Sequence, residues 1–284
     1  MKTGIVLEGG ASRGVFTTGV LDTMMEKGLE FDYCIGVSAG AGNAMHLKSR
    51  QPGRAYDLLV GGEEESFYGW QQARKSGKLI DLDHMYHEKS YDPDLPFDFG
   101  AYYANPMFCE YVVSCCETGN SEYLHEDVYQ KRLLDIVKAS CSMPGITGVV
   151  SLDGKHYLDG GVTDPMPVER AFEMGCDKVV LVLTKPAANL NPTDYARLRP
   201  LMSRLYKRRY PEFYAVLMSR VRRYLLQMGQ ILEMERSGRI FVIRPSHCEI
   251  STLEQDREKL RAYYAQGCAV TREKWDAMMD YLHR

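Results

Sequence analysis

Short, continuous apolar runs alternate along the first two thirds of the chain with segments whose apolar residues recur at helical spacing. The runs at residues 4–7, 33–35, 107–116 and 178–183 have the composition of buried parallel strands. Helical spacing follows the first run, at residues 16–27. The pattern therefore predicts strands joined by helices, the arrangement of a parallel α/β sheet.

The middle of the chain departs from this alternation. Residues 51–91 are polar and interrupted by glycines, so we expect helices and loops there, and the pattern leaves open whether residues 51–105 form a lid. Residues 129–141 carry apolar side chains on one helical face. Two short strands, at 149–152 and 156–158, are joined by an Asp-Gly pair and predict a hairpin.

The last third of the chain has a different character. Residues 197–223 are rich in arginine and lysine with tyrosine and phenylalanine between them. The apolar residues within 217–231 predict one long amphipathic helix. A last strand is predicted at 239–243 and a polar helix at 253–282.

Composition excludes several classes of protein. The 284 residues are 45% hydrophobic, which is enough for a large core, and the net charge of −3 favours no class of partner. The N-terminus does not resemble a signal peptide, and no apolar run approaches the roughly 20 residues that span a bilayer. The eight cysteines are scattered without a CxxC pair, so we expect them to stay reduced. A cytoplasmic protein without metal or cofactor is the expectation.

One turn is a candidate for catalysis. It follows an apolar strand, precedes a helix of small residues and consists of Gly36, Val37, Ser38, Ala39 and Gly40. A sharp strand-to-helix turn exposes its central side chain, and small neighbours avoid collisions in so tight a bend. The pentapeptide alone is equally compatible with an ordinary turn.

A second candidate is the loop after the first strand, which precedes a helix. The loop consists of Glu8, Gly9, Gly10, Ala11, Ser12, Arg13 and Gly14. It lacks the spacing of a dinucleotide fingerprint and the Gly-Lys-Ser/Thr of a P-loop. Its amides suit an oxyanion hole, and Arg13 either holds the loop or lies near a substrate phosphate. If the strands before the loop and before Ser38 are neighbours, both motifs face one crevice.

A serine nucleophile needs a base. Ser38, Asp159 and His247 occur in the order of an α/β-hydrolase triad, but only one strand precedes the strand that leads to Ser38, whereas that fold has several. His247 lies beside a proline in a predicted surface turn. Asp159, followed by Gly160 and Gly161, is either a plain turn or a carboxylate on a flexible elbow.

Four segments together resemble the patatin-like phospholipase family. They are Gly9-Gly10-x-x-Arg13-Gly14, Gly36-Val37-Ser38-Ala39-Gly40, Asp159-Gly160-Gly161 and the helix-to-proline stretch at 139–144. The resemblance implies a three-layer α/β/α fold with a mainly parallel sheet over residues 1–190, Ser38 as nucleophile, Asp159 as base and the glycine loop as oxyanion hole. Residues 191–284 resemble the mostly helical extension of a bacterial subgroup. Ala11 departs from the family's longer glycine run and is strained if its φ is positive.

The function that the resemblance implies is a serine lipid acyl hydrolase of the phospholipase A or esterase type with a Ser-Asp dyad. Two alternatives stay open: an acyltransferase that uses the same serine, and a catalytically weak lipid-binding protein on a hydrolase scaffold. The basic segment 197–223 suits peripheral contact with an anionic membrane, or is a solvated helix face packed on the catalytic domain. No nucleic-acid-binding module surrounds it, so no nucleic acid is expected as a partner.

Overall fold

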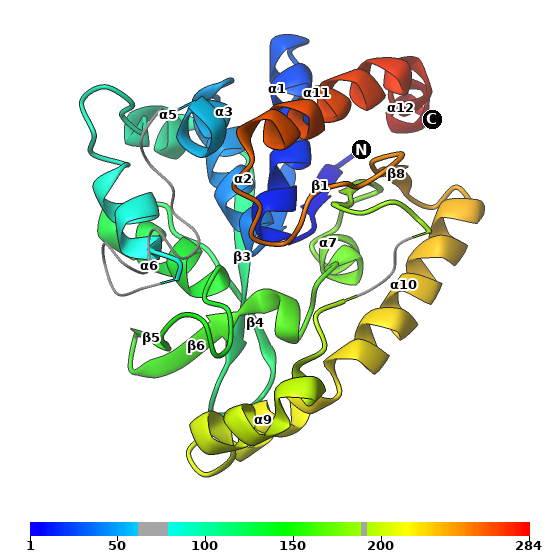
Figure 1. The fold of residues 1–284 in the computed structure, drawn as a ribbon. Helices are drawn as coiled ribbons and strands as arrows, with labels where there is room; N and C mark the ends of the chain where they lie inside the picture. The colour runs from blue at the N-terminus through cyan, green and yellow to red at the C-terminus, as the bar shows by residue number, and fades with distance from the viewer. Residues whose placement is uncertain (62–78, 189–191) are drawn as a thin grey trace.

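The computed structural model describes residues 1–61, 79–188 and 192–284. Within them one eight-stranded sheet has the order β5-β6-β3-β2-β1-β7-β8, and β4 pairs with β3 (Figure 1). The strands are β1 (Thr3–Leu7), β2 (Tyr33–Val37), β3 (Phe108–Cys115), β4 (Ser121–Leu124), β5 (Val150–Leu152), β6 (Lys155–Asp159), β7 (Lys178–Val182) and β8 (Phe241–Ile243). The predicted strands are confirmed, whereas the sequence pattern did not reveal β4.

The sheet is mainly parallel, as predicted. Strands β3, β2, β1, β7 and β8 run parallel, while β4, β5 and β6 are antiparallel to their partners. The neighbouring strands β1 and β2 pair so that Leu7 lies opposite Gly36. The loops after these two strands therefore leave the same edge of the sheet, which confirms the prediction that both motifs face one region.

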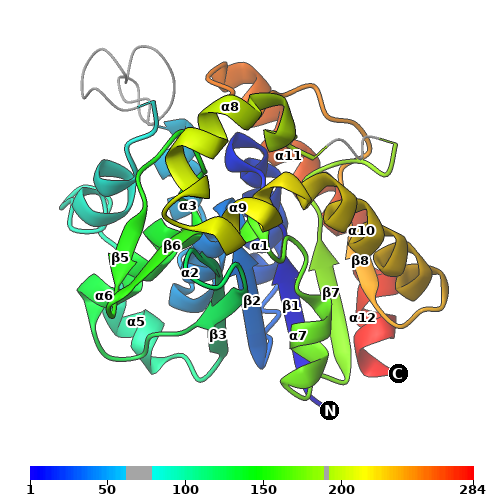
Figure 2. The same cartoon turned by 90° about the horizontal axis from the view of Figure 1, so that it is seen from below.

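Helices cover both faces of the sheet (Figures 1 and 2). The α-helices are α1 (Gly14–Glu26), α2 (Ala39–Ser49), α3 (Arg54–Tyr56), α5 (Phe99–Ala104), α6 (Gln130–Ser140), α7 (Val168–Glu173), α8 (Arg199–Met202), α9 (Pro211–Met218), α10 (Arg220–Arg236), α11 (Arg257–Glu273) and α12 (Trp275–His283). Short 3₁₀ or π turns are η1 (Ala11–Arg13), η2 (Asp57–Gly61), η3 (Asp83–Glu88), η4 (Gly160–Val162), η5 (Tyr195–Leu198) and η6 (Ser203–Lys207).

Alternate residues of one strand point to opposite helical layers, as the period of a strand requires. In β1, Ile5 and Leu7 pack in the core formed with α1 and α2. Val6, between them, packs in a separate core with residues of α7 and α10. These two cores, one on each face of the sheet, make the three-layer α/β/α arrangement.

The C-terminal third of the chain is built onto this framework. Strand β8 extends the sheet beside β7. Helix α11 lies against α1 so closely that a Cβ at Gly19 would stand 2.2 Å from the carbonyl oxygen of Tyr264, and one at Gly267 would stand 2.2 Å from that of Phe16. The helical character of this region is confirmed, and the division at residue 190 stays a prediction.

Two local predictions need correction, and one question about the lid stays open. The amphipathic helix expected over 217–231 is interrupted at Ser219, which separates α9 from α10, and Leu225 of its expected stripe is 47% exposed. The polar helix of 253–282 is two helices that meet at Lys274. Part of the possible lid, residues 62–78, lies outside the described residues.

Candidate active site

Ser38 occupies the sharp turn between β2 and α2. Its backbone has φ 55° and ψ −124°, a conformation that a residue with a side chain rarely adopts. The flanking glycines are required, because a Cβ at Gly36 would lie 2.4 Å from the carbonyl oxygen of Gly40, and a Cβ at Gly40 would lie 2.3 Å from that of Leu7. The sequence therefore builds a strained strand-to-helix turn that presents the Ser38 side chain.

Strand β3 brings Asp159 to this turn. Val112 of β3 pairs with Val37, the last residue of β2, and Val113 pairs with Asp159, the last residue of β6. Both partners lie on the same edge of β3, because β4 pairs with the other edge at these two positions. Strand β6 therefore meets β2 end to end. As a result the Ser38 hydroxyl donates a hydrogen bond of 2.7 Å to Asp159 Oδ2.

The Asp159 carboxyl is fixed from several sides. Its Oδ1 accepts a 2.8 Å hydrogen bond from the amide of Gly161, which belongs to the predicted elbow. Its own amide donates to the Ser142 carbonyl oxygen, and its carbonyl oxygen accepts from the Ser114 hydroxyl. Gly160 is needed for the close approach to β3, since a Cβ there would lie 2.2 Å from a backbone oxygen. The hydrogen bonds of its own backbone thus fix the position of Asp159.

Burial raises the pKa of Asp159 above the ordinary range of an aspartate. The hydrogen bonds from Ser38 and Gly161 and the positive charge of Arg220 oppose this shift. A carboxylate whose pKa is raised binds a proton more readily than an exposed one. The geometry therefore pairs a hydroxyl with an acceptor suited to receive its proton.

The glycine loop runs directly beside Ser38. A Cβ at Gly9 would stand 2.8 Å from the Ser38 Cβ, so no larger residue fits without displacement. Ala11 has φ 48°, which is the positive value that makes alanine strained. Ala11, which replaces a glycine of the family's glycine run, therefore has a left-handed backbone conformation.

The six loop amides are not equivalent. The amides of Ser12, Arg13 and Gly14 donate to the carbonyl oxygens of Thr252, Gly10 and Ala11, respectively. The amides of Gly9, Gly10 and Ala11 donate to no described residue. Only the first half of the predicted loop therefore has amides available for an oxyanion.

A cavity of about 60 Å³ opens over Ser38 and Asp159. Its walls include residues of the C-terminal third that sequence reasoning did not associate with the site. They are Thr193, Tyr195, Thr252, and Arg220 and Tyr224 of α10. No local motif marked them, because α10 reaches the site only through its packing on the sheet.

Histidine does not join this arrangement. His247, the third member of the alternative triad, is exposed and lies 3.0 Å from the Gln266 side chain. Among the described residues that line the cavity over Ser38, no histidine occurs. The expected surface position of His247 is confirmed.

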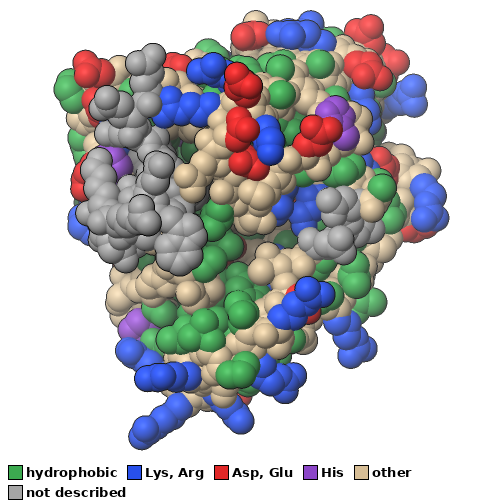
Figure 3. Space-filling model, viewed as in Figure 1, with side chains coloured by type: hydrophobic (Ala, Val, Ile, Leu, Met, Phe, Trp, Pro, Cys, Tyr) green, Lys and Arg blue, Asp and Glu red, His purple; other side chains and the backbone are tan. Residues whose placement is uncertain are grey.

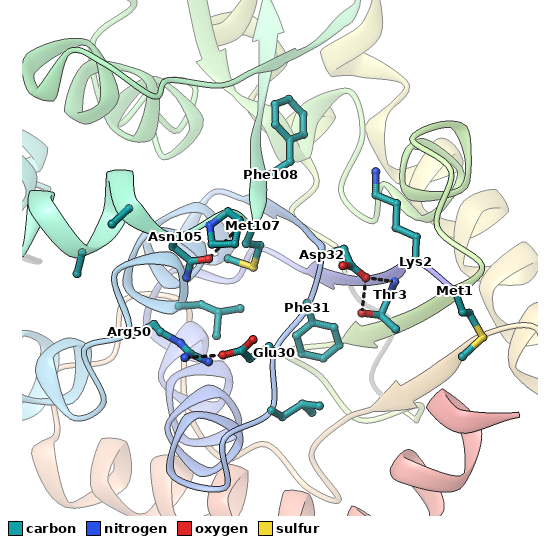
Figure 4. A pocket seen from close by; sticks show the side chains of 15 residues that line it. Met1, Lys2, Thr3, Glu30, Phe31, Asp32, Arg50, Asn105, Met107 and Phe108 are labelled. Carbon is teal, nitrogen blue, oxygen red and sulfur yellow. Dashed lines mark hydrogen bonds and ion pairs between the residues drawn. The ribbon is translucent and has the colours of Figure 1, made fainter.

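A larger cavity lies at the opposite edge of the sheet. Its volume is about 890 Å³, and its lining residues lie around the first residues of β1, β2 and β3 (Figure 4). Arg50 and Glu30 form an ion pair of 2.7 Å in its wall, and Asp32 accepts hydrogen bonds from Thr3. Neither Ser38 nor Asp159 is among its lining residues, so the larger cavity is not the candidate active site.

Comparison with known proteins extends these observations. The model of the family described as patatin-like phospholipase matches residues 5–172, which include both members of the Ser38–Asp159 pair. A model described as a domain of unknown function, DUF6363, matches residues 210–283.

Two curated relatives share part of the chain. The uncharacterized protein YjjU of Escherichia coli strain K12 is 32% identical over 189 residues, which cover 66% of this chain and 53% of YjjU. The lysophospholipase NTE1 of Scheffersomyces stipitis is 26% identical over 205 residues, covering 68% of this chain and 12% of NTE1. The chain thus spans about half of YjjU and a small part of NTE1. The crystal structure of VipD from Legionella pneumophila aligns over 97% of this chain and 67% of VipD, with a TM-score of 0.49 and 14% identity.

Proposed function

The chain belongs to the patatin-like phospholipase family, and from this premise we propose that it is a serine lipid acyl hydrolase in which Ser38 and Asp159 act as a dyad. The observation that carries the proposal is the 2.7 Å hydrogen bond from the Ser38 hydroxyl to Asp159 Oδ2 beside a glycine loop with unoccupied amides. The relatives named lysophospholipase support a lipid ester as the substrate.

The reaction proceeds in two halves. Asp159 takes the hydroxyl proton as Ser38 Oγ attacks the ester carbonyl carbon, and the oxyanion that forms accepts hydrogen bonds from the free amides of Gly9, Gly10 and Ala11. The C–O bond to the alcohol then breaks, and the alcohol leaves with the proton held by Asp159. A water molecule gives its proton to Asp159 and attacks the acyl-serine. The fatty acid departs, and the proton returns to Ser38 Oγ.

The test is hydrolysis of a short p-nitrophenyl ester and labelling by a fluorophosphonate. Ser38→Ala and Asp159→Asn should each lower kcat/KM at least about a thousandfold, because the members of such a unit act together. Matched controls are Ser237→Ala and Asp153→Asn, at exposed positions of the described surface. Labelling of the wild type at a residue other than Ser38, or full activity of Asp159→Asn, would contradict the dyad.

The two alternatives give different results in the same assay. An acyltransferase would transfer the acyl group to an added alcohol faster than to water, which product analysis detects. Such enzymes usually add a histidine base, and the described lining of the cavity contains none. A lipid-binding protein on a hydrolase scaffold would take no fluorophosphonate label.

A membrane-facing surface beside the cavity fits this function. Leu198, Leu201 and Leu205 are 51%, 45% and 43% exposed. Leu205 lies near Gly145, two residues from Met143 in the cavity wall. Exposed cations lie beside these leucines along the chain: Arg197, Arg199, Arg204, Lys207, Arg208 and Arg209. Figure 3 shows hydrophobic side chains beside a central hollow and Lys and Arg side chains along the lower edge.

Anionic lipid would attract these cations while the leucines enter the interface. No helix among the described residues has the length and apolarity to cross a bilayer. Removing two charges, Arg204→Gln with Lys207→Gln, should weaken partition onto phosphatidylserine vesicles roughly thirtyfold, at about 1 kcal/mol per charge. The control pair is Lys259→Gln with Arg261→Gln on α11. If the wild type binds vesicles of pure phosphatidylcholine as strongly as phosphatidylserine vesicles, the proposal that these cations bind anionic lipid is refuted.

A further inference from the structure

Three cationic side chains from distant parts of the chain line the cavity over Ser38. Arg13 belongs to η1, Lys185 follows β7, and Arg220 opens α10. The carboxylates that line the same cavity within the described residues are those of Glu8 and Asp159. With Asp159 ionised, the described residues of the wall therefore carry one more positive than negative charge. A single additional anionic group would balance it.

The structure holds these cations in place. Arg220 donates through Nε to the Gly161 carbonyl oxygen at 2.8 Å and through Nη1 to that of Thr193 at 2.9 Å. Arg13 Nη1 donates to Thr252 Oγ1 at 3.1 Å. Lys185 is 9% exposed, and its Nζ lies 5.5 Å from the Tyr224 ring centre. The cations are therefore fixed at the wall of the cavity.

The hydrogen-bonding capacity of the Glu8 carboxylate is largely taken up by Thr184 and Tyr224. Glu8 Oε2 accepts from both the amide and the hydroxyl of Thr184, and Oε1 accepts from the Tyr224 hydroxyl at 2.9 Å. Arg13 Nε is buried and has no hydrogen-bond partner among the described residues. A buried donor without a partner costs free energy, and the positive charge of this guanidinium stays at the wall of the cavity for an anion.

We propose that Arg13, Lys185 and Arg220 form a subsite for a phosphate group beside the ester that Ser38 attacks, an inference that rests on the proposed hydrolase function. A phosphate offers several oxygens at once, which matches two forked guanidinium groups and one ammonium. Its source is either the head group of a phospholipid or free phosphate.

A second, small cavity shows where the other half of such a lipid would begin. Its volume is about 30 Å³, and Ala11 lines it as well as the cavity with the cations. Apolar side chains make most of its wall: Ala39, Ala55, Leu58, Leu59 and Met85. The loop around Ala11 thus separates a cationic side from an apolar side, the division that a phosphate and an acyl chain require.

Binding is measured first in Ser38→Ala protein, so that the result is independent of hydrolysis. Glycerol 3-phosphate and inorganic phosphate are titrated by calorimetry, with glycerol as the uncharged reference. Adding Lys185→Met should weaken binding of the phosphates roughly tenfold to a hundredfold, the loss expected for a charge-assisted hydrogen bond. Lys259→Met, which removes the same charge from the exposed face of α11, should not change it.

Catalysis then distinguishes the two sources of phosphate. The ratio of kcat/KM for lysophosphatidylglycerol to that for a monoacylglycerol of the same chain should fall at least about tenfold in Lys185→Met. Phosphate binding that depends on Lys185, with an unchanged ratio, would assign the subsite to free phosphate. If neither phosphate binds and the ratio is unchanged, the subsite proposal is overturned. Phosphate binding without any ester hydrolysis would instead overturn the proposed function and leave the subsite standing.

A conservative variant separates charge from structural damage. Burial, and then the charges of Arg13 and Arg220, lower the pKa of Lys185 to about 8, while the charges of Glu8 and Cys248 oppose the shift. The ammonium is protonated below this pKa, so phosphate binding by the wild type should weaken as the pH rises through about 8. Lys185→Arg keeps its charge at that pH and should bind phosphate without this loss. The same pH dependence in both proteins would refute the role of Lys185.

Discussion

Ala11 stands in a backbone conformation that suits glycine, so Ala11→Gly should stabilise the protein. Its φ of 48° lies in the left-handed region, where a Cβ costs about 1–2 kcal/mol. Glycine loses more conformational freedom on folding, which costs about 0.4–1 kcal/mol. Because Ala11 is only partly buried, the loss of its methyl group removes little packing. The difference predicts a gain of about 0.5–1 kcal/mol in the free energy of unfolding.

Equilibrium unfolding in urea, followed by circular dichroism, measures this gain as a higher midpoint at constant slope. The matched control is Ala265→Gly, at an exposed position inside α11 where glycine should lower the free energy of unfolding by about 1 kcal/mol. The two variants make the same chemical change, so the opposite signs isolate the effect of φ. If Ala11→Gly lowers the midpoint as much as Ala265→Gly does, the strain at Ala11 has no energetic consequence and the reasoning is wrong.

Three further predictions concern the site and its support. Gly9→Ala would place a Cβ 2.8 Å from that of Ser38, and should lower kcat about a hundredfold to a thousandfold, which steady-state kinetics on folded protein would measure. The raised pKa of Asp159 predicts that kcat/KM rises with pH through a value above the ordinary aspartate range, and an acid limb within that range would contradict this. Gly267→Ala would place a Cβ of α11 2.2 Å from a backbone oxygen of α1, which forces the helices apart, and should cost about 1–3 kcal/mol of stability in thermal melts. Gly229→Ala, with open space around it, should cost nothing.

The elements that sequence analysis predicted well are those defined by neighbouring residues. Apolar runs indicated β1, β2, β3 and β7, and the small residues around Ser38 indicated a turn too tight for larger side chains. These signals are local, so one window of sequence contains them. Strand β4 was missed because its four residues, all only partly buried, carry no continuous apolar run. The break at Ser219 was missed because the apolar spacing continues across it.

The parts of the site that depend on distant contacts gave no local signal. The loop amides of residues 9–14 look alike in the sequence, and only the Thr252 carbonyl and the 3₁₀ turn η1 show which three are already bonded. In the sequence Arg220 is one of many basic residues of the segment 197–223, yet its side chain donates a hydrogen bond to the Gly161 carbonyl oxygen, close to Asp159. Charge composition could not separate it from the exposed cations around it.

The mixed character of the sheet explains how an aspartate can reach the serine without a histidine between them. Neighbouring parallel strands lie about 4.8 Å apart, and their carboxyl ends all lie at the same end of the sheet. Strand β6 instead runs antiparallel to β3 and pairs with the same side of β3, beginning where β2 ends at Val37. Two consecutive residues of β3 therefore pair with the last residue of β2 and the last residue of β6. The carboxylate therefore arrives in line with the turn, at 2.7 Å from the hydroxyl. That spacing leaves no room for an imidazole between the two side chains, so the proposed dyad would pass the proton directly from Ser38 to Asp159.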